Sequence, residues 1–159
     1  MNIRNSIITK SMLKNIFTQK VLNVAIVEPN KLLSKHLNEL IKSHRPHFKI
    51  ILLEDSEQVF SLMYGEMDID ILFFDIEAET DTDNLALIKA ISPQTRAIHW
   101  SDYQHPEVIE LLYNLGVNSF CTKESDAKIV LEATDLATNY PQSLYLDRKL
   151  HQCLPLLQN

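Results

Sequence analysis

The feature that most constrains this fold is the regular alternation of short apolar runs with segments of helical periodicity. Apolar runs of strand length occupy residues 21–27, 48–53, 69–74, 96–100 and 119–122. Each run is followed by a segment in which apolar residues recur every three or four positions, as on one face of an amphipathic helix. The runs are continuously apolar, which is typical of parallel strands buried on both faces. The pattern therefore predicts an α/β fold of five β-α units, with a parallel sheet between two layers of helices.

Two local patterns refine the predicted element boundaries. The segment after the third strand, residues 75–83, is rich in acidic residues, and we predict it to be a loop. Helical spacing resumes at Leu85, where we expect the next helix to begin. Ser125 or Asp126 is a suitable N-cap for the last helix of the series, since both side chains can accept a hydrogen bond from the first turn.

The length of the chain, 159 residues, suits one domain with extensions at both ends. We place the domain at residues 21–139, an N-terminal extension at 1–20 and a C-terminal tail at 140–159. The extension carries four basic and no acidic residues, with apolar residues at helical spacing between them. It is predicted to be a basic amphipathic helix that docks on an acidic partner or a membrane surface, or else an extension that folds back on the acidic body.

The C-terminal tail is too short for a DNA-binding output domain, which needs some tens of residues and a basic face. Its apolar residues recur at steps of three and four, and we predict it to be helical. Two alternatives stay open: the tail packs on its own domain, or it pairs with a second copy or another protein. The apolar stripe consists of Leu146, Leu150, Cys153, Leu154 and Leu157.

Charge and composition exclude several classes of function. Residues 21–159 carry a net charge of −10, so nucleic acid is not an expected partner. No stretch has the roughly 18 consecutive apolar residues of a membrane span, and we expect no integral membrane segment and a cytoplasmic location. The only glycines are Gly65 and Gly116, which excludes the glycine-rich loops of dinucleotide and P-loop sites. The two cysteines lack metal-site spacing and are expected to be reduced thiols.

Four polar residues follow the predicted strands at the end where ligands bind in open parallel sheets. Glu28 follows the first strand, Asp75 the third, Ser101 the fourth and Lys123 the fifth. Such a set suits phosphoryl chemistry on a carboxylate, in which Asp75 attacks a phosphoryl donor while Lys123 and Ser101 hold the phosphoryl oxygens. A divalent cation such as Mg²⁺ would screen the charge, with Glu28 as an acidic ligand.

At these residues the sequence resembles the receiver domain of two-component response regulators, over about residues 21–139. The resemblance lies in VAIVEPN, DILFFD, AIHWS and LGVNSFCTK. It implies a flavodoxin-like three-layer (βα)5 sandwich with sheet order 2-1-3-4-5. It also implies that Asp75 is phosphorylated by a histidine kinase or phosphotransfer protein, that Ser101 and Lys123 assist, and that Phe120 is an aromatic switch residue. Glu28, Asp75 and the backbone of Glu77 become the expected Mg²⁺ ligands.

The sequence departs from the family at the proposed metal site. Receivers usually carry two adjacent acids after the first strand, whereas Pro29 occupies the second position here. Magnesium affinity is therefore expected to be reduced, and the chain resembles an atypical, stand-alone receiver. We expect it to signal by protein–protein contact with a downstream target, including self-association as a homodimer, and not to be an enzyme.

Two alternatives from other classes stay open. A degenerate pseudo-receiver would act as a scaffold or dimerisation module without phosphorylation. A phosphohydrolase of the haloacid-dehalogenase type also uses an aspartate after a strand, and Asp75-Ile76-Glu77 faintly matches its DxD motif. The Gly-Thr and cap insertion expected of that enzyme class are absent from the sequence.

Overall fold

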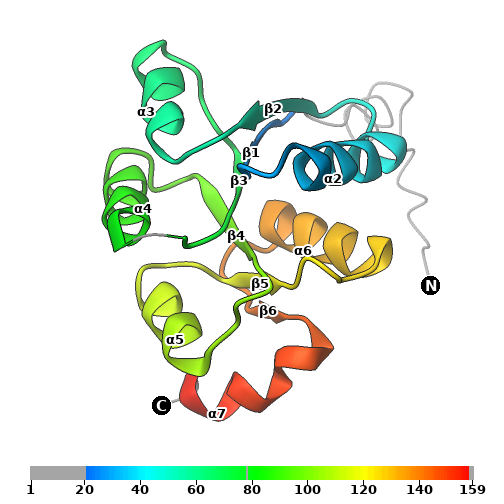
Figure 1. Ribbon diagram of the computed structural model, residues 1–159, viewed down its shortest axis with the longest axis vertical. Coiled ribbons are helices and arrows are strands. Elements are labelled where there is room, and N and C mark those ends of the chain that lie inside the picture. Colours follow the sequence, from blue (N-terminus) through cyan, green and yellow to red (C-terminus); the bar gives the residue numbers. More distant parts are fainter. Residues whose placement is uncertain (1–20, 78, 158–159) are drawn as a thin grey trace, which may run out of the picture.

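The computed structural model describes residues 21–77 and 79–157, which form one α/β domain (Figure 1). Strands and helices alternate along the whole length of this domain. The predicted N-terminal helix of residues 1–20 lies outside the described residues. The strands are β1 (Asn23–Val27), β2 (Lys49–Leu53), β3 (Ile71–Phe74), β4 (Arg96–Trp100), β5 (Ser119–Cys121) and β6 (Tyr145–Leu146). The helices are α2 (Lys31–His44), α3 (Glu57–Tyr64), α4 (Glu79–Ile91), α5 (Pro106–Asn114), α6 (Ala127–Asn139), the 3-10 helix η1 (Arg148–Cys153) and α7 (Leu154–Leu157).

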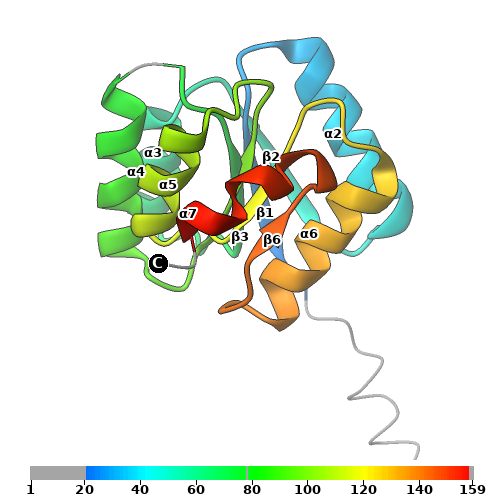
Figure 2. The same cartoon turned by 90° about the horizontal axis from the view of Figure 1, so that it is seen from below.

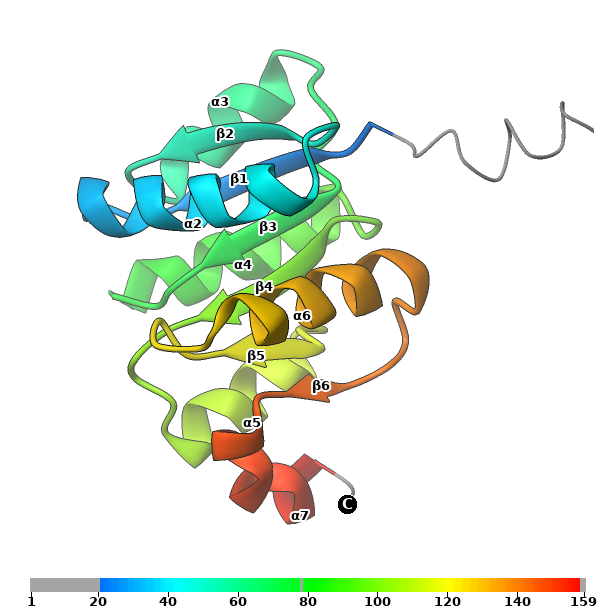
Figure 3. The same cartoon turned by 90° about the vertical axis from the view of Figure 1, so that its right-hand side faces the viewer.

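All six strands form one parallel sheet in the order β2-β1-β3-β4-β5-β6. The predicted flavodoxin-like arrangement and the order 2-1-3-4-5 are confirmed, with a sixth strand added beside β5. Helices α2 and α6 cover one face of the sheet, and α3, α4 and α5 cover the other (Figures 2 and 3). The sheet is thus the middle layer of three.

Side chains from successive strand positions divide between two apolar cores, one on each face of the sheet. In β3, Ile71 and Phe73 pack toward α2 and α6, whereas Leu72 and Phe74 pack toward α3, α4 and α5. All four side chains are buried. This burial on both faces explains why the strand runs are continuously apolar in the sequence.

The C-terminal tail packs against its own domain. Tyr145–Leu146 adds strand β6 to the edge of β5, and the following η1 and α7 lie beside α5 (Figure 3). The side chains of Leu146, Leu150, Cys153 and Leu157 are buried in the same core as α3, α4 and α5. A two-residue strand has too few positions to show a period, which is why sequence periodicity indicated only a helix here.

Helix α4 begins earlier than its apolar spacing indicated. Its first residue is Glu79, so half of the acidic segment predicted as a loop is helical. Acidic side chains favour the first turn of a helix because its free N–H groups carry partial positive charge. Asp81 accepts a hydrogen bond from the backbone N–H of Glu77 at 2.9 Å and another from the hydroxyl of Ser56 at 3.0 Å. These bonds connect the start of α4 to the segment that follows Asp75.

The N-cap of α6 agrees with the prediction. The side chain of Asp126 accepts a hydrogen bond from the N–H of Ile129 at 3.0 Å. Helix α2 begins in the same way at Asn30, whose side chain accepts from two backbone N–H groups of the first turn. None of the helices in the described part of the chain combines the length and the apolar character needed to span a bilayer.

Candidate functional site at the carboxyl edge of the sheet

Three charged side chains meet where strands β1, β3 and β5 end. The ammonium group of Lys123 lies 2.6 Å from Glu28 Oε2 and 3.0 Å from Asp75 Oδ2. The side chains of Glu28, Lys123 and Asp75 are 2%, 9% and 12% exposed, so the cluster is largely withdrawn from water. Since β1 and β3 are neighbours, the residues that follow them stand side by side. The structure thus brings together three of the residues that the sequence predicted for this site.

Asp75 is held as a carboxylate. Burial acts to raise its pKa, but the neighbouring polar side chains of His99, Ser101 and Lys123, together with the charge of Lys123, lower that pKa to about 2. The backbone N–H of Ile76 also donates to Asp75 Oδ1 at 2.7 Å. The ionised form is the protonation state that a nucleophilic aspartate needs.

Lys123 is fixed from several directions. Burial acts against its charge, yet the hydrogen bonds to Glu28 and Asp75 raise the pKa of the ammonium group above its ordinary value. The ammonium also lies 5.5 Å from the centre of the Trp100 ring, within the range of a cation–π contact. Lys123 is therefore a permanent positive charge beside Asp75.

Ser101 is fully buried directly after β4. Its hydroxyl oxygen accepts a hydrogen bond from the backbone N–H of Tyr103 at 2.9 Å and lies 3.3 Å from the carbonyl oxygen of the same residue. The serine therefore connects the site to the loop between β4 and α5. Phe120, the residue implied to be an aromatic switch, is fully buried with its ring edge-on to His99.

His99 is a residue of the site that sequence analysis did not single out. Its Nε2 lies 3.5 Å from Asp75 Oδ1 and has no hydrogen-bond partner, although the side chain is completely buried. The amide nitrogen of Gln104 donates to the carbonyls of Ser101 and Cys121, so the amide oxygen is left to accept from His99 Nδ1 at 3.0 Å. A signal was present in the sequence: His99 is two residues before Ser101, and such residues share one face of a strand.

The predicted Mg²⁺ ligands do not form a site that fits the ion. Glu28 Oε1 accepts from the backbone N–H of Asn30 at 2.9 Å, while its other oxygen pairs with Lys123. Pro29 offers no side-chain oxygen. Within the described residues, no three His, Cys, Asp or Glu side chains are grouped so as to hold a metal ion. The two carboxylates among the predicted ligands are both paired with Lys123.

The pKa of the Glu77 carboxyl group is affected by the other acidic side chains of the site. Partial burial, followed by the negative charge of Glu28, raises the pKa of its carboxyl group. Its backbone N–H is committed to Asp81. The residue thus borders the cluster without joining the Lys123 pairs.

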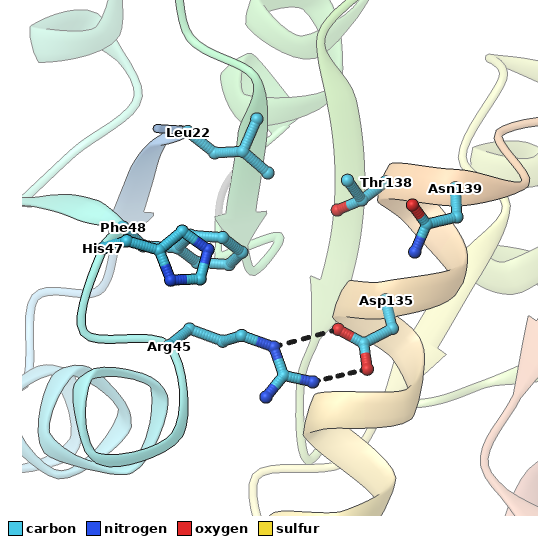
Figure 4. Close-up of a pocket in the computed structure, with 7 residues that line it drawn as sticks. All are labelled: Leu22, Arg45, His47, Phe48, Asp135, Thr138 and Asn139. Carbon is cyan, nitrogen blue, oxygen red and sulfur yellow. Dashed lines mark hydrogen bonds and ion pairs between the residues drawn. The ribbon is translucent and has the colours of Figure 1, made fainter. Parts of the chain in front are cut away.

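A second hollow lies at the opposite edge of the sheet, between the end of α2 and the end of α6 (Figure 4). It has a volume of about 380 Å³, and Arg45 forms a two-pronged ion pair across it with Asp135, at 2.6 and 3.2 Å. Leu22 and Phe48 form its apolar wall. Because Leu22 and Phe48 precede strands β1 and β2, this hollow is remote from the carboxyl ends of the strands and from Asp75.

Comparison with known proteins identifies structures that share this fold. The sequence matches no protein-family model, and a search of curated proteins finds no significant match. Solved structures do match. A LuxR family DNA-binding response regulator from Silicibacter pomeroyi is 18% identical, with 81% of this chain and 99% of that chain covered and a TM-score of 0.71. A response regulator from Thermotoga maritima is 18% identical, with 73% and 96% covered and a TM-score of 0.66.

A third structure is the isolated REC domain of RcsB from Salmonella enterica serovar Typhimurium, determined in the presence of the phosphomimetic BeF3−. It is 14% identical, with 84% of this chain and 99% of that chain covered and a TM-score of 0.70. At these identities the similarity concerns the backbone and not the chemistry. The described chain has the α/β fold of response-regulator receiver domains, extended by a sixth strand and a C-terminal helical segment.

Proposed function

We propose that the protein acts as a receiver whose Asp75 accepts a phosphoryl group. The observation that carries the proposal is the ionised, mostly buried Asp75 carboxylate with the Lys123 ammonium 3.0 Å from its Oδ2. A carboxylate oxygen supplies the nucleophile, and the ammonium supplies a positive charge next to the atoms that would receive the phosphoryl oxygens. The receiver fold of the neighbouring structures supports the same assignment.

The proposed step transfers one phosphoryl group. An oxygen of Asp75 forms a bond to phosphorus while the bond from phosphorus to the donor breaks. The donor is a phosphohistidine of a histidine kinase or phosphotransfer protein, which leaves as imidazole, or a small acyl phosphate, which leaves as a carboxylate. Lys123 stays protonated throughout and pairs with the new phosphoryl oxygens, and the hydroxyl of Ser101 donates a hydrogen bond to them.

The output in this proposal is a protein–protein contact that depends on the state of Asp75. The site opens beside the loop that carries Tyr103, whose side chain is exposed and whose backbone is bonded to Ser101. A change at Asp75 that draws the Ser101 hydroxyl inward breaks these bonds and releases the loop. The partners are then a phosphodonor protein and a downstream protein, with a second copy of the chain as one form of the latter.

The test is intact-mass analysis after incubation with acetyl phosphate, run in parallel with Mg²⁺ and with a chelator. We expect a single phosphoryl adduct on the full chain and none on Asp75→Asn, which has the same shape without the nucleophilic charge. An adduct that persists in Asp75→Asn would contradict the assignment, as would no adduct under either condition. Steady release of phosphate from small esters would favour the phosphohydrolase alternative, since a receiver is expected to be modified and not to turn over such substrates.

A second candidate is a phosphorylation-independent receiver that acts as a scaffold. The observation that favours it is the pairing of Lys123 with Glu28 as well as Asp75, because one ammonium already serves both buried carboxylates. Under this alternative, Asp75→Asn and Asp75→Glu leave the affinity for the downstream partner and the sedimentation behaviour unchanged. Under the first proposal, these two variants differ from each other or from the phosphorylated wild type.

A further inference from the structure

The contact between Glu28 and Lys123 holds in place the positive charge that lies next to Asp75. The Lys123 ammonium lies between two carboxylate oxygens, at 2.6 and 3.0 Å. Both distances are within the range of direct ion pairs. Glu28 is almost fully buried and its other oxygen is fixed by the backbone N–H of Asn30, so the carboxylate is held in an orientation that presents Oε2 to Lys123.

The two carboxylates and the one ammonium of the cluster sum to one negative charge. Two carboxylates share one ammonium, and each charge is at least seven-eighths buried. Buried carboxylates require a partner because transfer from water to the protein interior costs several kcal/mol per ion. Lys123 meets this requirement from within the chain.

The two carboxylates that could bind a cation are already paired with Lys123. Oxygen-ligand sites for Mg²⁺ combine carboxylates with waters, and a cation competes with any ammonium already bound to those carboxylates. Next to Glu28 the chain has Pro29, an exposed residue without a side-chain oxygen. The orphaned His99 Nε2 is a nitrogen donor, which hard divalent cations disfavour.

We propose that Glu28 is a positioning residue that holds Lys123 as the built-in counter-cation of Asp75, and that the crevice consequently takes up no divalent cation at millimolar concentration. The inference stands whether or not Asp75 accepts a phosphoryl group. It assigns Glu28 a different role from that of a metal ligand, and it makes the state of the site insensitive to Mg²⁺.

The first test is direct counting of bound Mn²⁺ by electron paramagnetic resonance, in which the signal of the free hydrated ion disappears on binding. We expect wild type to match Asp75→Asn, with no saturable site tighter than about 1 mM, the weak end of the range for oxygen-ligand cation sites. A saturable site in wild type that Asp75→Asn removes would overturn the proposal.

A matched pair of variants at position 29 tests the charge argument. Pro29→Asp adds the missing acid on the exposed loop, and Pro29→Asn adds the same shape without charge. We expect Pro29→Asp to bind one Mn²⁺ at least about tenfold more tightly than wild type, a difference of about 1.4 kcal/mol. Pro29→Asn should remain at the wild-type level. Equal binding by both variants, or none by Pro29→Asp, would overturn the proposal.

A third measurement addresses Lys123 itself. In Lys123→Met the two carboxylates lose their counter-charge, so a divalent cation becomes a ligand that stabilises the folded state by mass action. We expect Mn²⁺ to raise the melting temperature of Lys123→Met by several degrees and that of wild type by none. An unchanged melting temperature in Lys123→Met would contradict the role of Lys123 as the counter-cation. None of these readouts involves phosphoryl transfer, so failure here and failure of the phosphorylation test are separate results.

Discussion

Ion pairs of the same length lie at the two ends of the sheet, in very different surroundings. At the carboxyl edge, Lys123 and Glu28 are 2.6 Å apart with side chains 9% and 2% exposed. At the amino edge, Arg45 and Asp135 are also 2.6 Å apart, but with 26% and 45% exposed. The distance between charged atoms therefore does not distinguish the buried cluster from a surface contact, whereas the exposure of the side chains does.

The two pairs differ further in how many charges depend on the cation. Lys123 pairs with both Glu28 and Asp75, while among the described residues Arg45 pairs with one carboxylate, that of Asp135. Loss of the cation at the carboxyl edge leaves two buried carboxylates without a counter-charge. Loss of the cation at the amino edge leaves one carboxylate that water already reaches.

The largest effect is expected from Lys123→Met, which keeps the length of the side chain and removes its charge. We expect the free energy of unfolding at pH 7 to fall by about 3–5 kcal/mol, the usual cost of breaking a buried pair from one side. This loss in the free energy of unfolding should become smaller as the pH is lowered, because protonation neutralises the Glu28 and Asp75 carboxylates that no longer have a counter-charge. Urea denaturation at several pH values measures both effects.

The matched control is Lys128→Met, since Lys128 is also a lysine paired with a glutamate, at 3.9 Å and with 83% of its side chain exposed. This control should change the free energy of unfolding by no more than about 0.5 kcal/mol, as for other exposed pairs on helices. Similar losses in the two variants would contradict the distinction between the two environments.

A second prediction concerns the pH dependence of the buried cluster. The pKa of Asp75 is about 2 in the folded chain and 3.8 when unperturbed. The folded state therefore binds the proton less readily, and the stabilisation is present above pH 3.8 and is lost as the pH falls toward 2. The two values correspond to about 2 kcal/mol.

Urea denaturation of wild type and Asp75→Asn between pH 5 and pH 2 tests this expectation. The difference in free energy of unfolding between the two proteins should change by about 2 kcal/mol over this range, with wild type losing more as the pH falls. Parallel curves for the two proteins would show that Asp75 does not titrate differently in the folded and unfolded states.

The contrast between the two edges also shows how far sequence alone could lead. Asp75 could be predicted because it directly follows an apolar run, and parallel topology sends the carboxyl ends of all strands to one edge. The same argument placed Lys123 and Glu28 nearby. Arg45 and Asp135 are separated by 90 residues in the sequence and neither belongs to a recognisable motif. Nothing in the sequence therefore indicated that they form a pair.

The chemical details of the site depend on side-chain reach, which periodicity does not report. Glu28 was predicted to bind a metal ion, yet it points one oxygen at Lys123 and the other at the N–H of Asn30. His99, which sequence analysis did not single out, is a completely buried residue of β4. Its 3.5 Å approach to Asp75 depends on the register between β3 and β4, which pairs Phe74 with His99.

The smallest effect is expected at the amino edge, from Arg45→Met. Its two-pronged pair with Asp135 joins the end of α2 to α6, but both side chains remain in contact with water (Figure 4). We expect a loss of at most about 1 kcal/mol in the free energy of unfolding at low salt, because exposed pairs gain little over hydration. The loss should diminish further at about 1 M salt, where the screening length is near 3 Å. A loss as large as that of Lys123→Met, unaffected by salt, would mean that the hollow between α2 and α6 is as dry as the crevice at Asp75, and burial would then no longer distinguish the two edges.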